Sequence, residues 1–368
     1  MKFRCLISAL LLAVSLFSLP VMANDVPSYN QIVIFGDSLS DNGNLYHTSL
    51  GIIPKSPPYY QGRFSNGPAW SELVADYFAD KAHVVTVNYA VGGETVNFHN
   101  PLKGFLPYTF TNSLDSYYLH TAFRDKTHSL FVIWLGANDY LKGATDPEQA
   151  TADVIVTIQK NLDSLISSGG KNFLIINLPD LAAVPLTSAG TTREILHTIT
   201  LLHNKKLQDM VDAAEQQHPD ISIHIFDVYH VYEDLANNLP AYNEKYHTHI
   251  KNVTDPCWDG GYFKLAMMPV TEDEIRRSLE ADYQRKTTMS VVDESKAPLD
   301  FSALEHYVAI SPDLLESYQV SKIYASNKTA CTQPDDYAFW DHIHPTAAVH
   351  TILGGIVIEQ INQFYHNS

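Results

Sequence analysis

The segment FGDSLSDNGN, residues 35–44, carries a serine that could act as a nucleophile. Ser38 lies between two carboxylates, Asp37 and Asp41, directly after a short apolar run, and the chain has no histidine between this segment and His47. A serine hydroxyl is a weak nucleophile until a general base activates it. The segment also lacks the G-x-S-x-G pattern of the α/β-hydrolase turn. Taken alone, it is more typical of a polar turn after a strand.

A candidate base stands near the other end of the chain. The segment FWDHIHPT, residues 339–346, places Asp341 three residues before His344. Within a turn, such a carboxylate can hold the imidazole in one tautomer and leave its other nitrogen free to take a proton from a serine. The order Ser38, Asp341, His344 is permissible for a triad, because triads are defined by geometry. Pro345 is expected to end this turn and to occupy the first position of a terminal helix.

Apolar runs that alternate with helical stretches must bring these residues together. The runs are nearly continuous in Ile, Val and Phe, which is typical of strands buried on both faces of a parallel sheet. The expected strands are 31–35, 83–90, 129–136, 172–180 and 221–229, and the expected helices are 69–80, 146–170, 191–217 and 346–365. This alternation predicts a three-layer α/β/α domain around a central parallel sheet.

Three polar motifs follow directly on expected strand ends. GDSLSDNGN follows the first strand, GGET (92–95) the second and GANDY (136–140) the third. In sheets of this kind, ligands bind beyond the carboxyl ends of the strands, at a topological switch point. We therefore expect the three loops to share one rim and to build one site.

These motifs resemble the sequence blocks of the GDSL, or SGNH, hydrolases. FGDSLSDNGN resembles block one, NYAVGGET (88–95) block two, GANDY block three and DHIHPT (341–346) block five. GRFSNGPAW (62–70) is similar to the segment that follows block one. The blocks occur in the family's order across nearly all of the chain. The resemblance implies a flavodoxin-like SGNH-hydrolase fold and ester hydrolysis that uses no cofactor.

The resemblance also assigns roles to individual residues. Ser38 would attack an ester carbonyl, His344 would take the serine proton, and Asp341 would hold His344. The oxyanion hole would consist of the backbone N–H groups of Ser38 and Gly93 and the side-chain amide of Asn138. Considered singly, Gly93 could be a turn glycine, Asn138 a helix N-cap and Asp341 a surface turn residue.

Two other patterns raise the question of a metal site. DSLSDNG is faintly similar to a calcium loop, but an EF-hand starting at Asp37 needs glycine and glutamate where the chain has Asn42 and Thr48. The H-x-H pairs at 342–344 and 247–249 leave a metallohydrolase as a minority alternative. We expect no metal.

The N-terminus has the features of a secretory signal peptide. Lys2 and Arg4 precede an apolar stretch of 15 residues, and small residues end at Ala23. That stretch is too short to span a bilayer, so we expect residues 1–23 to be removed and residues 24–368 to be exported, to the periplasm or out of the cell. The full chain carries a net charge of −17, and loss of Lys2 and Arg4 takes it to −19. This charge disfavours nucleic acid as a partner.

The segment from about residue 240 to 335 breaks the α/β pattern because it contains no strong strand. TEDEIRRSLEADYQRK (271–286) begins with a capping box and carries a thin apolar stripe, which predicts a helix. Removal of the signal peptide removes Cys5, and Cys257 and Cys331 remain. Two cysteines in an exported chain indicate one disulfide. Two free buried thiols are the alternative, whereas structural zinc usually needs more cysteines. We expect residues 258–330 to form a tethered insertion in a single domain.

The amino-acid sequences of these motifs resemble those of bacterial exported phospholipases A, lysophospholipases A and glycerophospholipid:cholesterol acyltransferases. This implies a lipid or lysophospholipid substrate and an acyl-enzyme that water or a sterol acceptor resolves. In the acyltransferase members, cleavage within a disulfide-bounded loop accompanies activation. We therefore expect residues 258–330 to contain a lid or an inhibitory segment and an activating protease to cut there. An inert surface excursion is the alternative.

Two further functions stay open. Export and aromatic richness would also suit an esterase of carbohydrates or of short-chain esters. An exported, non-catalytic binding protein on a degenerate hydrolase fold would be favoured by a missing motif residue, and none is missing. Hydrolysis of a nitrophenyl ester by the wild type but not by Ser38→Ala separates the enzyme from the binding protein.

Overall fold

A computed structural model describes most of the chain. The described residues are 29–97, 109–141, 144, 146–187, 191–258, 272–289, 301–310 and 330–365. The expected signal peptide, residues 1–23, and much of the expected insertion, residues 258–330, lie outside them.

Five parallel strands form the central sheet, in the order β2-β1-β3-β4-β5. They are β1 (Gln31–Gly36), β2 (Val85–Asn88), β3 (Ser129–Trp134), β4 (Asn172–Ile176) and β5 (Ser222–Phe226). Strands β1, β3 and β4 are buried along almost their whole length, which explains their continuous apolar runs. The strand order is that of flavodoxin, so the predicted fold class is confirmed.

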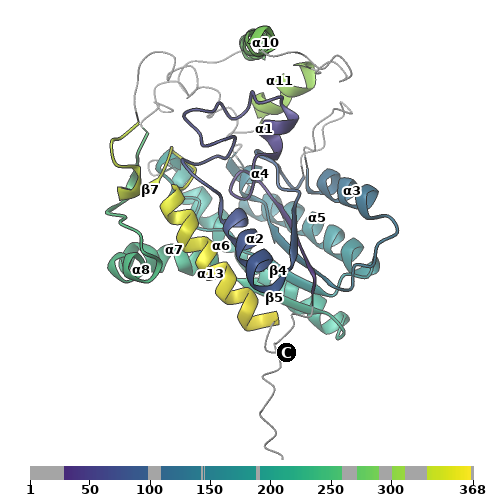
Figure 1. Ribbon diagram of the computed structural model, residues 1–368. Coiled ribbons are helices and arrows are strands. Elements are labelled where there is room, and N and C mark those ends of the chain that lie inside the picture. The colour runs from purple at the N-terminus through teal and green to yellow at the C-terminus, as the bar shows by residue number, and fades with distance from the viewer. Residues whose placement is uncertain are drawn as a thin grey trace, which may run out of the picture.

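Helices cover both faces of this sheet (Figure 1). One layer contains α2 (Trp70–Ala82) and α13 (Ala347–Tyr365), and the other contains α3 (Phe110–Thr121), α5 (Pro147–Ser167) and α6 (Thr191–Gln217). The start of α5 shows why these stretches are helical: the Asp146 side chain accepts the N–H of Gln149, and Pro147 occupies the first turn.

Shorter helices lie in the connections between these elements. They are α1 (Asn44–Thr48), α4 (Ala137–Leu141), η1 (Pro185–Thr187), α7 (Val228–Asn237), α8 (Leu239–Tyr246) and η2 (Pro334–Asp336). From β1 the chain moves to β2 on one side, and it then returns to β3 on the other, so the topological switch point lies between β1 and β3. The loops that carry Ser38 and Asn138 leave these two adjacent strands, at the place where such sheets bind ligands.

A small second sheet lies at the base of the insertion. Its strands β6 (Asn252–Pro256) and β7 (Tyr337–Phe339) pair in parallel. Residues 240–335 were expected to contain no strong strand, and β6 is a short strand that the sequence did not predict. Its sequence, NVTDP, has no apolar run and is mostly accessible, so backbone pairing with β7 rather than burial defines it. The predicted disulfide between Cys257 and Cys331 is present directly after β6.

Two helices of the insertion, α10 (Glu272–Met289) and α11 (Phe301–Ile310), lie beyond α1 in Figure 1. The helix predicted at 271–286 is confirmed from Glu272 onward. Its apolar stripe is buried at Ile275 and Leu279 and half-buried at Tyr283. This stripe packs into a group that we call the α10 cluster, which also contains Leu45, Ile52, Ile53, Phe64, Val91 and Val308.

The terminal helix starts later than predicted. Helix α13 begins at Ala347, because Pro345 forms an isolated bridge with Phe339 of β7 instead of occupying the first helical position. The bridge folds residues 339–345 into a tight loop, and that loop carries Asp341 and His344.

Candidate active site

His344 joins the serine near one end of the chain to a carboxylate near the other. Its Nε2 lies 3.0 Å from Ser38 Oγ, and its Nδ1 lies 2.7 Å from Asp341 Oδ2. The side chains of Asp341 and His344 are fully buried. Asp341 Oδ1 accepts the backbone N–H groups of Ile343 and His344, at 2.8 and 2.7 Å. The three residues predicted to form a triad are thus in hydrogen-bond contact.

The surroundings of Asp341 keep it ionised. Burial alone would raise the pKa of Asp341, but the charge and hydrogen bonds of His344, together with the hydroxyl of Tyr59, hold that pKa below its ordinary value. An ionised Asp341 favours the proton on His344 Nδ1. The Nε2 atom is then a hydrogen-bond acceptor facing Ser38.

The two carboxylates beside Ser38 bind backbone groups rather than the histidine. Asp37 Oδ1 accepts the N–H of Leu39 at 3.0 Å. The Asp41 carboxylate accepts four backbone N–H groups, from Gly43, Asn44, Leu45 and Gly92. Burial raises the pKa of Asp41 to about 6, and these four donors oppose the rise. Both aspartates shape the turn that presents Ser38.

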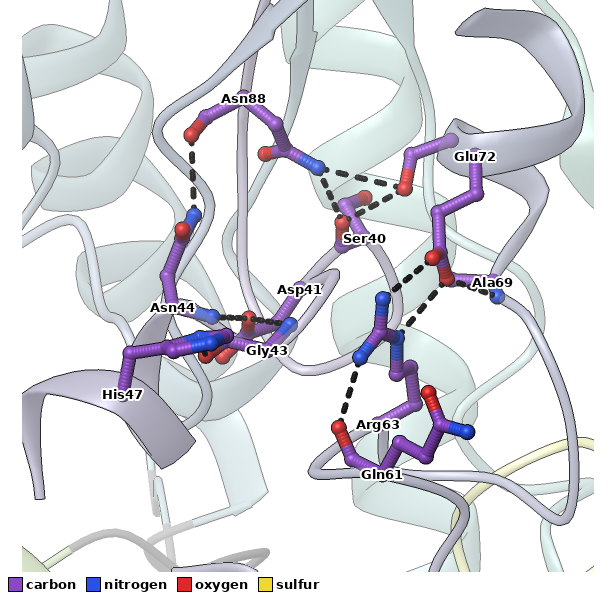
Figure 2. A network of polar contacts seen from close by, with 11 residues as sticks. Ser40, Asp41, Gly43, Asn44, His47, Gln61, Arg63, Ala69, Glu72 and Asn88 are labelled. Atoms are coloured by element: carbon purple, nitrogen blue, oxygen red, sulfur yellow. Dashed lines mark hydrogen bonds and ion pairs between the residues drawn. The ribbon is translucent and has the colours of Figure 1, made fainter. Parts of the chain in front are cut away.

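A wider polar network fixes the same turn against its neighbours (Figure 2). Asn88, at the end of β2, donates to the Ser40 carbonyl at 2.7 Å, and Asn44 donates to the Asn88 carbonyl at 2.9 Å. On the other side, Arg63 pairs with Glu72 of α2 through Nε–Oε2 at 3.0 Å and Nη2–Oε1 at 2.5 Å. The Ser71 hydroxyl of α2 also donates to the Ser40 carbonyl, at 2.9 Å. The serine loop is therefore held by the end of β2 and by α2, and the Arg63–Glu72 pair ties the GRFSNGP segment to the same helix.

The predicted oxyanion-hole residues come from adjoining loops. The N–H of Gly92 donates to Asp41 at 2.8 Å, and Asn138 Nδ2 donates to the backbone carbonyl of the residue after Gly93 at 3.1 Å. Gly93 lies between the two residues that make these hydrogen bonds. Its backbone has φ +75°, a conformation that favours glycine. Asn138 is the second residue of α4, not its N-cap. Ser38 and Asn138 line the same cavity.

This cavity, of about 240 Å³, opens beside Ser38 and is mainly apolar. Its walls come from α4, the loop after β4, α7 and the segment around β7. Characteristic lining residues are Leu141, Leu178, Leu181, Val184, Tyr232 and Leu235. Three carboxylates, Asp37, Asp180 and Glu233, also contribute. An apolar cavity next to the Ser38 hydroxyl is of a kind that holds apolar ligand groups.

Sequence reasoning missed two aromatic residues that contact the triad. The Tyr59 hydroxyl donates to Asp341 Oδ2 at 2.6 Å, and the Phe64 ring centre lies 5.1 Å from that of His344. No spacing rule connects positions so far apart. The one available signal was that both aromatic residues lie in or beside GRFSNGP, a segment that already resembled part of the family pattern.

The H-x-H pairs do not converge. His342 is buried in the triad turn, where its carbonyl accepts the N–H of Leu186 at 2.9 Å, whereas His249 is exposed after α8. Within the described ranges, no group of three or more His, Cys, Asp or Glu side chains is arranged to hold a metal ion.

Comparison with known proteins adds to this geometry. The chain is 28% identical over 353 residues to a phosphatidylcholine-sterol acyltransferase of Aeromonas hydrophila, covering 95% of this chain and 94% of that protein. It is 25% identical over 341 residues to a thermolabile hemolysin of Vibrio parahaemolyticus, covering 90% and 64%. It is 27% identical over 232 residues to the secreted effector protein SseJ of Salmonella typhimurium, covering 60% and 52%. The family model described as GDSL-like lipase/acylhydrolase matches residues 32–356. The chain therefore belongs to the GDSL-like lipase/acylhydrolase family and is an ester hydrolase or acyltransferase.

Proposed function

We propose that the mature chain is an exported serine esterase that cleaves the acyl esters of phospholipids and lysophospholipids. One observation carries the proposal: the hydrogen-bonded series Asp341–His344–Ser38 ends at an apolar cavity of about 240 Å³. An acyl chain in that cavity would bring its ester carbonyl to Ser38. The similarity to a protein named for phosphatidylcholine supports the same class of substrate.

In this mechanism, Ser38 Oγ attacks the ester carbonyl while His344 Nε2 takes the hydroxyl proton. The ionised Asp341 stabilises the imidazolium that forms. The backbone N–H groups of Ser38 and Gly93 and the Asn138 amide stabilise the oxyanion. Collapse of the tetrahedral intermediate breaks the bond to the leaving alcohol, and His344 returns the proton to that alcohol. Ser38 then carries the acyl group.

The acyl-enzyme can be resolved by water or by a second alcohol. Water releases a fatty acid, and a sterol hydroxyl would release a sterol ester. In either case His344 removes the proton of the attacking hydroxyl and passes it to Ser38. The relative named as a phosphatidylcholine-sterol acyltransferase supports a sterol as the acceptor.

The first test is hydrolysis of a nitrophenyl ester by the wild type, by Ser38→Ala and by Ser40→Ala as a matched serine control. We expect activity to be lost only in Ser38→Ala and to resist a chelator. Chelator-sensitive activity that survives in Ser38→Ala would favour a metallohydrolase. A wild type that binds the ester without cleaving it would favour a binding protein.

The second test is a substrate panel. Phospholipid, lysophospholipid, lysophospholipid with cholesterol, and an acetylated sugar are each incubated with the enzyme, and the products are separated. We expect fatty acid from the lipids and sterol ester where cholesterol is present. Faster turnover of the acetylated sugar would replace the lipid proposal with that of a carbohydrate esterase.

We further propose that the insertion, residues 258–330, contains a lid. Helix α10 covers a cluster that includes Phe64, and Phe64 packs on His344, so the insertion is one packing layer away from the base. Limited proteolysis inside the insertion should raise activity on lipid. The variant Leu279→Asp, which loosens α10, should do the same, whereas exposed Arg277→Asp should not. Unchanged activity after cleavage would leave the insertion as an inert excursion.

We propose export of residues 24–368 as one domain after removal of residues 1–23. Among the helices of the described ranges, none is long and apolar enough to cross a membrane. The relative named as a secreted effector supports an extracellular or periplasmic place. N-terminal sequencing of the exported protein should begin at Asn24, and an intact Met1 would contradict the proposed cleavage.

A further inference from the structure

We propose that Tyr59 is a positioning residue for the reaction, acting through Asp341. This inference rests on the proposed function, because it assigns Tyr59 a part in the orientation of the triad. The residue lies outside every motif that carries the family resemblance and comes from a loop 282 positions away from Asp341.

Tyr59 supplies a hydrogen bond that the triad turn cannot supply itself. Three of the four hydrogen bonds to the Asp341 carboxylate come from the turn: the two backbone N–H groups on Oδ1 and the imidazole on Oδ2. Within the described chain, the hydroxyl of Tyr59 is the one donor to this carboxylate from outside the turn, and it reaches Oδ2 at 2.6 Å. It binds the same oxygen that holds His344, so it fixes the angle at which that oxygen meets the imidazole.

The phenol ring is itself held on several sides. Tyr59 is 1% exposed, and its ring centre lies 5.9 Å from that of Phe64, 6.0 Å from that of Trp258 and 6.4 Å from that of His344. The cluster around it also contains the disulfide residue Cys257. A ring enclosed in this way cannot swing its hydroxyl away from Asp341 without disturbing its neighbours.

The hydroxyl should affect turnover rather than binding. Tyr59 does not line the cavity beside Ser38, so its loss removes no contact with an acyl chain. The titratable groups that act on Asp341 are His344 and Tyr59, and His350 interacts in turn with His344. The hydroxyl of Tyr59 helps to lower the pKa of Asp341. In a variant without this hydroxyl, the pKa of Asp341 should therefore be higher.

The experiment compares Tyr59→Phe with Tyr60→Phe, a neighbouring and partly exposed tyrosine. In Tyr59→Phe we expect kcat to fall roughly ten-fold with KM unchanged. The acid limb of the kcat–pH profile should move to higher pH, and Tyr60→Phe should match the wild type. An unchanged kcat and acid limb in a folded Tyr59→Phe would overturn the inference. So would a fall in kcat with an unmoved acid limb, which indicates packing alone.

A second replacement at position 59 tests the inference if Tyr59→Phe fails to fold. A fluorinated tyrosine at position 59 retains the ring and donates a stronger hydrogen bond, so the acid limb should move to lower pH. An acid limb that does not move would overturn the inference. Ser38→Ala, assayed alongside, separates the two proposals: activity that survives in Ser38→Ala overturns the proposed function, whereas a failure confined to position 59 overturns this inference alone.

Discussion

Asn138 is the residue whose proposed role can be isolated most cleanly. Its amide donates to a backbone carbonyl at 3.1 Å and lines the cavity beside Ser38. In Asn138→Ala we expect kcat to fall by about 10²–10³ with KM nearly unchanged, because an oxyanion donor acts mainly in the transition state. The lost ground-state hydrogen bond should cost only about 1 kcal/mol in the free energy of unfolding. Steady-state kinetics and urea unfolding measure the two effects. A rise in KM as large as the fall in kcat would contradict this role.

At the residue scale, the sequence predicts contacts between residues that are close in the chain or that belong to recognised motifs. Asp341 and His344 are three positions apart, so a turn was enough to pair them. Their contact with Ser38 was predictable only from the chemistry of a triad and from the family resemblance, because the turn that carries them follows β7 and not a strand of the central sheet. Tyr59 was not predictable, because its contact with Asp341 depends on how a loop of irregular backbone crosses the rim.

The turn after β2 depends on a glycine for a packing reason. A Cβ added to Gly92 would lie 2.5 Å from Phe64 Cζ, and Phe64 packs against His344. We expect Gly92→Ala to cost roughly 1–3 kcal/mol of stability, as overpacking does, and to lower kcat by displacing the ring beside His344. Thermal unfolding and ester hydrolysis check both effects. Because a smaller side chain makes room, Gly92→Ala combined with Phe64→Leu should recover part of the stability, and no recovery would argue against the clash.

At the scale of elements, long apolar runs were predicted well and short pairings were not. The helix expected over residues 191–217 coincides with α6, and the five strands of the sheet were all expected. Strand β6 was missed because its five residues carry no burial signal. The start of α13 was misplaced because the bridge of Pro345 to β7 is a tertiary contact that overrides the helix-start preference of proline.

The whole molecule should lose stability in mild acid through two buried histidines. Burial lowers the pKa of His203 to about 3, and burial with the nearby His344 lowers that of His350 to about 3. Below an unfolded-state pKa of about 6.5, the unfolded chain binds protons that the folded chain does not, so stability falls as pH falls. Each histidine should contribute up to about 1.4 kcal/mol per pH unit between pH 6.5 and pH 3.

Urea unfolding at pH 7, 6 and 5 measures this dependence. His203→Asn, which cannot take up the proton, should show a shallower loss of stability with falling pH than the wild type. His249→Asn, at an exposed site, should follow the wild type. A slope in His203→Asn equal to that of the wild type would contradict the prediction. The carboxylates contribute to all three proteins alike, so the difference between slopes reports the histidine.

The separation of 306 positions between Ser38 and His344 also bears on the order in which the site is synthesised. A growing chain carries the proposed nucleophile, Ser38, almost from the start, but Asp341 and the proposed base, His344, are added only about 300 residues later. Because the proposed triad is completed last, a fragment that ends before Asp341 lacks the group proposed to activate Ser38 and should show no esterase activity.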